Sequence, residues 1–117
     1  MAKHQVDVRK RRFTGPRPVE DEVPKPPKYL SRKARDVWKA AWQEFHFSAA
    51  EAALLEQGLR ELDRAMEAEE VLRKDGITVE TGADMVRAHP AVKIAKDSLG
   101  AYRAVLRDLG LRDVEGA

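Results

Sequence analysis

Residues 81–111 read T-G-A-D-M-V-R-A-H-P-A-V-K-I-A-K-D-S-L-G-A-Y-R-A-V-L-R-D-L-G-L, and this stretch decides the fold because it joins a helix-start signal to a wide apolar stripe. Pro90 stands after His89, where the first turn of a helix needs no N–H, so the stretch predicts a helix over 91–109. Gly110 supplies a stop. The apolar residues recur at steps of three and four and therefore share one face: Val92, Ala95, Leu99, Tyr102, Leu106 and Leu109. That face needs cover, which we expect from another helix of this chain and from further copies of it.

Two more helices are predicted upstream. Ser31 is a candidate N-cap for a first helix over 31–45, whose apolar residues keep helical spacing: Ala34, Val37, Trp38, Ala41, Trp42 and Phe45. Ser48 and Glu51 fit a capping box, so a second helix is expected to run from there to about Lys74. Its apolar seam consists of Leu55, Leu59, Leu62 and Met66. At ~1.5 Å per residue it is ~40 Å long, too long for the core of a small globule.

Between the second and third helices the period changes. Asp75-Gly76 ends the second helix, and Ile77, Val79 and Thr81 alternate with polar residues as a strand does. A turn at 82–84 then allows a hairpin with residues 85–87. Two such strands are only marginally stable alone, so the hairpin is expected either to pack on the helices or to pair with a neighbouring subunit. The predicted fold is mainly all-α, a helical hairpin with an N-terminal helix and a short β-hairpin or extended segment.

Composition predicts one domain in a reducing compartment. The chain has 117 residues and no cysteine, and its mean hydropathy is −0.57. No run approaches the roughly 18 apolar residues of a membrane span, and the N-terminus lacks a secretory apolar run, so the cytoplasm is expected and no membrane partner. Five prolines at 16, 18, 24, 26 and 27 exclude regular structure there. We therefore divide the chain into an extended or disordered arm at 1–28, a helical oligomerisation domain at 29–111 and a short tail at 112–117.

The arm carries most of the positive charge. Residues 1–17 hold six basic side chains against Asp7 alone, a net charge of +5, whereas residues after 28 hold 14 basic and 16 acidic ones. A basic tail on a mildly acidic body is common in proteins that bind polyanions. The candidate DNA-binding residues are those of the arm and of the first helix: Lys3, Arg9, Lys10, Arg11, Arg12, Arg17, Arg32, Lys33, Arg35 and Lys39. Alternatively, these cations only aid the solubility of the chain, or the arm cluster is a nuclear-localisation signal.

The helices are expected to carry more apolar surface than one copy can cover. The residues predicted to meet neighbouring copies are Leu55, Leu59, Leu62, Met66, Val92, Leu99, Tyr102 and Leu106. The alternative is a compact three-helix bundle that closes on itself. The two tryptophans and Phe45 resemble a base-stacking platform, but their helical spacing favours a core role.

No pattern predicts catalysis. His4, His46 and His89 stand in different contexts without metal-ligand spacing, and the chain lacks cysteine ligands, so no metal or cofactor is expected. His89 is interpreted as an N-cap or turn residue rather than a base, and His46 as a corner residue between two helices. The glycines lack the spacing of a phosphate-binding loop, which argues against an ATPase.

Three segments together resemble the small terminase subunit of tailed double-stranded-DNA phages. They are V-P-K-P-P-K-Y-L-S-R-K-A-R-D-V-W-K at 23–39, H-P-A-V-K-I-A-K at 89–96 and L-R-D-L-G-L at 106–111, in the family's order. The resemblance implies a non-enzymatic packaging adaptor in the host cytoplasm. It also implies a ring of roughly eight to ten copies with double-stranded DNA and the large terminase subunit, an ATPase and nuclease, as partners.

Two other functions remain open from the residues alone. One is a helical scaffolding or protein-interaction module whose basic tail binds nothing specific. The other is a small DNA-binding transcriptional regulator, which needs a recognition helix for the major groove. The only short candidate, at 31–45, shows an apolar face but no evident base-reading residues.

Overall fold

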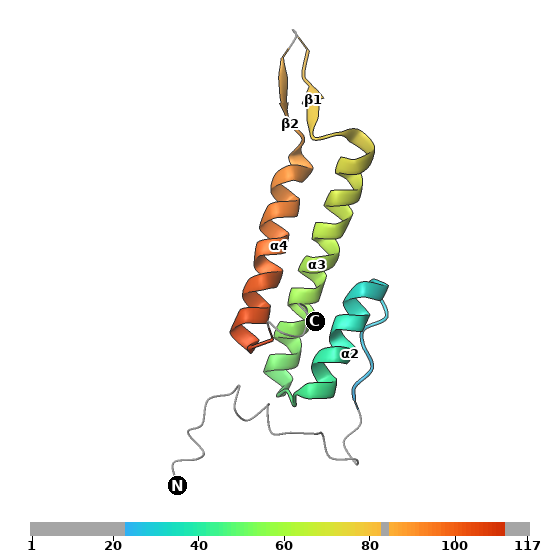
Figure 1. The fold of residues 1–117 in the computed structure, drawn as a ribbon, viewed down its shortest axis with the longest axis vertical. Helices are drawn as coiled ribbons and strands as arrows, with labels where there is room; N and C mark the ends of the chain where they lie inside the picture. Colours follow the sequence, from blue (N-terminus) through green and yellow to red (C-terminus); the bar gives the residue numbers. More distant parts are fainter. Residues whose placement is uncertain (1–22, 83–84, 112–117) are drawn as a thin grey trace.

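The computed structural model describes residues 23–82 and 85–111. They form three helices and one two-stranded sheet, in the order α2 (Arg32–Glu44), α3 (Ala49–Asp75), β1 (Thr78–Glu80), β2 (Val86–Ala88) and α4 (Pro90–Leu109). Figure 1 shows α3 and α4 side by side as a long helical hairpin, with α2 against the lower half of α3. The predicted fold, mainly helical with a small β-hairpin, is confirmed.

α2 and α3 begin directly after their predicted N-caps, Ser31 and Ser48, and α4 begins at Pro90, one residue before its predicted start. The Ser31 Oγ accepts a hydrogen bond from the Ala34 N–H at the start of α2. At the start of α3 both bonds of the capping box form, from the Glu51 N–H to Ser48 Oγ (3.1 Å) and from the Ser48 N–H to Glu51 Oε1 (2.8 Å). These bonds satisfy N–H groups that have no partner within a helix, and therefore fix where α2 and α3 start.

Glycines end the two long helices. Gly76 caps α3 with φ 87°. Gly110 caps α4 with φ 74°, donating its N–H to Arg107 O, while Leu111 donates to Leu106 O (2.7 Å). This pair of bonds is a Schellman motif, and Leu111, which is fully buried, anchors the chain after it. A side chain other than glycine is strained at both positive-φ positions.

The β-hairpin forms as predicted and continues beyond the helix ends (Figure 1). Val79 pairs with Arg87 in the antiparallel register, and the His89 N–H donates to Ile77 O where β2 meets α4. Residues 83–84 of the turn lie outside the described residues. Ile77, Met85 and Val86 remain 66%, 64% and 60% exposed. The hairpin therefore does not bury these side chains against the helices of its own chain.

The core joins all three helices. Gly58 of α3 lies so close to α4 that a Cβ placed on it would stand 2.7 Å from Val105 Cγ1. Both tryptophans and Phe45 are buried in α2 and at its end, as the core interpretation predicts. The buried cluster that links the helices comprises Leu30, Ala34, Val37, Trp38, Ala41, Trp42, Phe45, Leu55, Leu59, Leu62, Tyr102, Val105, Leu106, Leu109 and Leu111.

α2 covers only half of the helical hairpin that α3 and α4 form. α2 has 13 residues and α3 has 27, so at ~1.5 Å per residue they span about 20 and 40 Å. In Figure 1, α2 lies beside the lower part of α3 and leaves the part next to the β-hairpin uncovered. There, Val71 of α3 and Ile94 of α4 are 40% and 45% exposed. The three helices thus form a bundle at one end, which we call the proximal end, and a two-helix rod at the other, distal, end.

Most of the residues predicted to meet neighbouring copies lie inside the protomer instead. Five of the eight are buried in its own core, namely Leu55, Leu59, Leu62, Tyr102 and Leu106. These five side chains hold α2, α3 and α4 together, because the apolar seam of α3 faces α4. Met66 and Leu99 are partly buried, and Val92 is 37% exposed. Any surface between copies must therefore be built mainly from other side chains.

Candidate nucleic-acid interface

Residues 1–22 of the arm lie outside the described residues. They include six of the ten predicted DNA-binding side chains, namely Lys3, Arg9, Lys10, Arg11, Arg12 and Arg17. The structure does describe the last part of the arm, residues 23–28, and the four cations predicted on the first helix. The geometry of the candidate interface is therefore that of the arm's attachment and of α2.

Two backbone carbonyls of the proline-rich segment are bound by side chains of α2. Trp38 Nε1 donates to Pro24 O (2.8 Å), and a terminal nitrogen of Arg35 donates to Lys28 O (3.3 Å). Trp38 is buried, so its indole N–H gains a partner without reaching water. The last part of the arm is thereby attached to the body before α2 begins.

A carboxylate of α3 holds the first residue before α2. Asp63 accepts two hydrogen bonds from Ser31, one from the backbone N–H (2.8 Å) and one from the hydroxyl (2.5 Å). The same hydroxyl oxygen accepts from Ala34, so the N-cap of α2 and the contact to α3 share one side chain. Bonds to a charged acceptor are stronger than neutral ones, which makes Asp63 the main polar link between α3 and the entry to α2.

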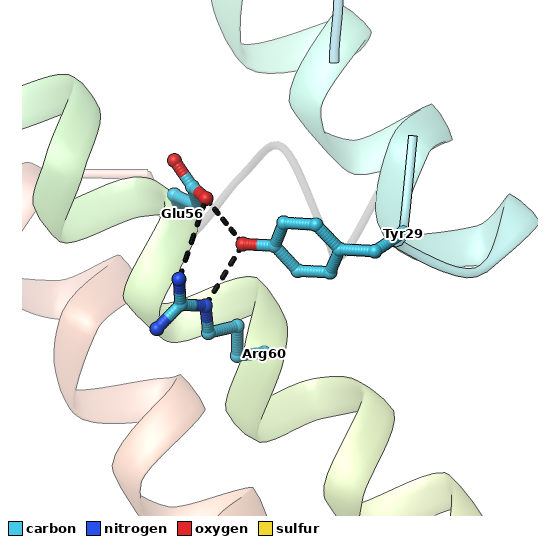
Figure 2. Close-up of polar contacts among 3 residues, drawn as sticks. All are labelled: Tyr29, Glu56 and Arg60. Atoms are coloured by element: carbon cyan, nitrogen blue, oxygen red, sulfur yellow. Dashed lines mark hydrogen bonds and ion pairs between the residues drawn. The ribbon is translucent and has the colours of Figure 1, made fainter. Parts of the chain in front are cut away.

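Tyr29 adds a second link, drawn in Figure 2. Its hydroxyl donates to Glu56 Oε2 and accepts from Arg60 Nε (2.8 Å), while Arg60 also pairs with Glu56 at 3.7 Å. Burial, and then the hydrogen bond to Glu56, raise the pKa of Tyr29 above its ordinary value. The hydrogen bond to Tyr29 raises the pKa of Arg60. Sequence analysis missed this cluster, because no local pattern relates residues separated by 27 and 31 positions.

The four cations predicted on α2 do not share one environment. Arg32, Lys33 and Lys39 are exposed, so their charges can reach a polyanion. Arg35 is half-buried and is engaged with Lys28 O. The DNA-binding role of these residues stays a prediction, and the geometry favours the three exposed ones. The face of α2 that carries the tryptophans is buried in the core. That face therefore cannot read DNA as a recognition helix would.

His89 has a structural role. His89 caps α4, because its Nδ1 accepts from the Ala91 N–H (3.0 Å). Nε2 then carries the ring proton and faces Asp75 Oδ2 at 3.1 Å. This confirms the N-cap interpretation and ties the end of α3 to the start of α4. In residues 23–82 and 85–111, no three His, Cys, Asp or Glu side chains gather in a way that could hold a metal ion.

A groove of about 870 Å³ lies between α3 and α4 at the distal end. Its lining includes Ala68 and Val71 from α3, and Ala91, Ile94 and Ser98 from α4. Charged residues of both helices, among them Arg64 and Asp97, complete it. Within the described part of the chain, no helix is long and apolar enough to cross a membrane. Exposed apolar side chains of the described residues therefore include Val71 and Ile94 at the groove and Ile77, Met85 and Val86 at the β-hairpin.

Comparison with known proteins gives one match. The family model described as phage terminase, small subunit, matches residues 34–114, which is more than half of the chain. The matched range includes nearly all of α2 and the whole of α3, the β-hairpin and α4. No curated protein and no solved structure matches the chain.

Proposed function

The chain belongs to the small-subunit family of phage terminases, and on this basis we propose that it is a DNA-packaging adaptor that binds viral DNA. Further, it recruits the large terminase subunit in the host cytoplasm and regulates the ATPase and nuclease of that partner. Small subunits of this family are generally non-catalytic, because those activities belong to the large subunit. The family match over the helical body is the observation that carries the proposal.

The basic arm supplies the contact to DNA. Each cation that neutralises a phosphate releases counterions, so the arm binds with little sequence preference and with affinity that falls steeply with salt. The bonds from Trp38 to Pro24 O and from Ser31 to Asp63 support this role, since they fix the point where the arm joins the body. Arg32, Lys33 and Lys39 extend the positive surface from the arm onto α2.

Copies of the chain assemble through the distal end, in a ring of roughly eight to ten by family resemblance. Exposed Val71 and Ile94 at the groove, together with Ile77, Met85 and Val86 on the β-hairpin, support this placement. Exposed apolar side chains gathered at one end of a molecule favour contact with a partner, and a two-stranded hairpin is only marginally stable without further contacts. In a ring, weak arms act together and gain through effective concentration.

One variant tests the arm. Replacing Arg9, Lys10, Arg11 and Arg12 with alanine is expected to weaken binding to duplex DNA across a salt series while the native mass stays that of the wild type. Titration by fluorescence anisotropy measures the affinity, and light scattering measures the mass. Unchanged affinity at low salt would refute the role of the arm. If the wild type itself shows no affinity that falls with salt, the chain is a scaffolding module instead.

A second variant tests the assembly surface. Ile77→Thr together with Val86→Thr keeps a β-branched residue at each position, directly before β1 and at the first residue of β2, so the hairpin itself is expected to persist. Because both side chains are exposed within the protomer, the expected effect is a lower native mass with an unchanged helical signal in circular dichroism. An unaltered mass would remove the β-hairpin from the interface. A wild type that is a well-folded monomer at high concentration would remove the ring.

Partner recruitment has its own readout. The purified chain is expected to co-elute with the large subunit and to change its rate of ATP hydrolysis. Absence of both effects would restrict the proposed function to DNA binding.

A further inference from the structure

The outward face of α4 carries a line of cations that the arm and α2 do not explain. Lys93, Lys96, Gly100, Arg103 and Arg107 follow one another at steps of three, four, three and four, so they share one face of the helix. All five are exposed. We call these residues the α4 basic stripe. The buried face of α4, which carries Tyr102 and Leu109, points the other way, toward α3.

Most of this charge is not used inside the protomer. Lys93 pairs with Asp97 at 2.9 Å. Lys96, Arg103 and Arg107 form no ion pair or side-chain hydrogen bond with residues 23–82 or 85–111. Helix neighbours three and four positions from Lys96 and Arg103 include no carboxylate.

Helix stability alone does not explain these cations. Arg103 and Arg107 stand four residues apart, where like charges repel. Arg107 gains from the negative end of the helix dipole, but Lys96 and Arg103 lie in the interior of α4 and do not. Two cations thus occupy positions where the protomer gives them no favourable partner.

Gly100 is a second, independent sign of an external contact. Glycine is among the least favourable residues for a helix interior, and Gly100 lies in the middle of α4. A Cβ added to it would meet nothing within 4 Å. The packing of the protomer therefore gives no reason for a glycine here, in contrast to Gly58, which Val105 contacts closely. Its effect is to lower the surface between Lys96 and Arg103, so that a bulky partner can approach the helix backbone.

We propose that the α4 basic stripe binds the sugar-phosphate backbone of duplex DNA, as a contact separate from the basic arm. This deepens the proposed function and rests on it. From Lys96 to Arg107 the helix rises about 16 Å, and the same length of duplex carries roughly ten phosphates. Each cation can therefore meet a phosphate of its own. A contact with another copy is less favoured, because the most exposed apolar side chains, Ile77, Met85 and Val86, lie on the β-hairpin and not on this face.

The test compares two double variants that remove the same charge. Lys96→Gln with Arg103→Gln changes the stripe, and Arg73→Gln with Lys74→Gln, on exposed residues of α3, is the matched control. Glutamine is a good helix former, so both variants should fold. The stripe variant is expected to bind duplex DNA about tenfold or more weakly than the control at 0.1 M salt. Its plot of log affinity against log salt should also be shallower by about 1.8, because each lost phosphate contact removes about 0.9.

A single variant tests the glycine. Gly100→Ala is expected to raise the melting temperature and yet to lower DNA affinity, since the added methyl group stands where the backbone of the duplex approaches. If Gly100 had only a structural role, the melting temperature and the DNA affinity would not change in opposite directions. A stripe variant that binds as tightly as the control, or a Gly100→Ala variant that binds as tightly as the wild type, would overturn the proposal.

Three other outcomes distinguish this inference from the proposed function. If the stripe variant loses native mass while the control keeps it, the face lies between copies, and the DNA assignment is overturned. If the wild type fails to bind DNA at low salt, the proposed function fails first. If only the arm variant loses affinity, the proposed function stands and the stripe is removed from it.

Discussion

Replacing Gly58 with alanine should destabilise the protein, although alanine is the better helix former. The added Cβ would lie 2.7 Å from Val105 Cγ1, 2.9 Å from its Cβ and 3.2 Å from its Cγ2. Rotation of the valine side chain cannot relieve the contact with Val105 Cβ, so α3 and α4 must move apart along part of their seam. Overpacking of this kind costs about 1–3 kcal/mol, and the rigid contact favours the upper end. Alanine returns about 1 kcal/mol of helix propensity, which leaves a net loss of about 1–2 kcal/mol.

The matched control is Gly100→Ala, which makes the same chemical change in α4 where a Cβ meets nothing within 4 Å. It is expected to gain about 0.5–1 kcal/mol. Thermal unfolding followed by circular dichroism, at one fixed protein concentration, compares the two variants, since a change of 1 kcal/mol moves the melting temperature of a domain this size by about 4–8 °C. Melting temperatures that rise for both variants would refute the close packing of α3 on α4 at Gly58.

Three further substitutions test the polar contacts. His89→Ala should cost about 1 kcal/mol by removing the cap on the Ala91 N–H, whereas His89→Asn should cost much less, as urea unfolding would show. Asp63→Ala should cost about 2 kcal/mol because Ser31 loses a charged acceptor for two hydrogen bonds, and Asp63→Asn should cost less in the same assay; equal losses would contradict the role of the charge. The pKa of Tyr29 is raised in the folded state, so its contribution to stability is fully present below its ordinary value of about 10 and is lost as pH rises from that value through the raised pKa. The stability advantage of the wild type over Tyr29→Phe should therefore be constant below the ordinary value and shrink above it, and a difference that stays constant above it would contradict this role.

The sequence predicted where helices begin and end because those signals are local. The hydrogen bonds at Ser31, Ser48 and Gly110 join residues within five positions of one another. A short stretch of sequence is therefore enough to predict them. The β-hairpin was predictable for the same reason, since alternation and a glycine turn are short-range features. His89 fits this pattern as a cap whose partner, Ala91, is two residues away.

The orientation of α4 about its own axis was less predictable. The stripe that includes Val92 and Leu99 indicated one face, yet Ser98 and Val105 are buried and Val92 is 37% exposed. The close approach of α3 at Gly58 selects Val105 as the contact, and a glycine on one helix leaves no periodic signal on another. The sequence alone also does not show whether an apolar seam packs within a protomer or between copies. For that reason Leu55 and its neighbours were assigned to the surface between copies.

The uneven cover of the helical hairpin separates two kinds of surface along one rod. At the proximal end, α2 buries the apolar seam of α3, and the exposed groups there include cations of α2 as well as Arg103 and Arg107 of α4. Among the described residues no third helix covers the distal end (Figure 1), and Val71 and Ile94 stay exposed at the groove. Contacts between copies that depend on apolar burial at the distal end therefore need not compete for space with contacts to phosphates at the proximal end. Salt should weaken the second kind far more than the first, because screening acts on exposed charges and salt does not weaken apolar burial.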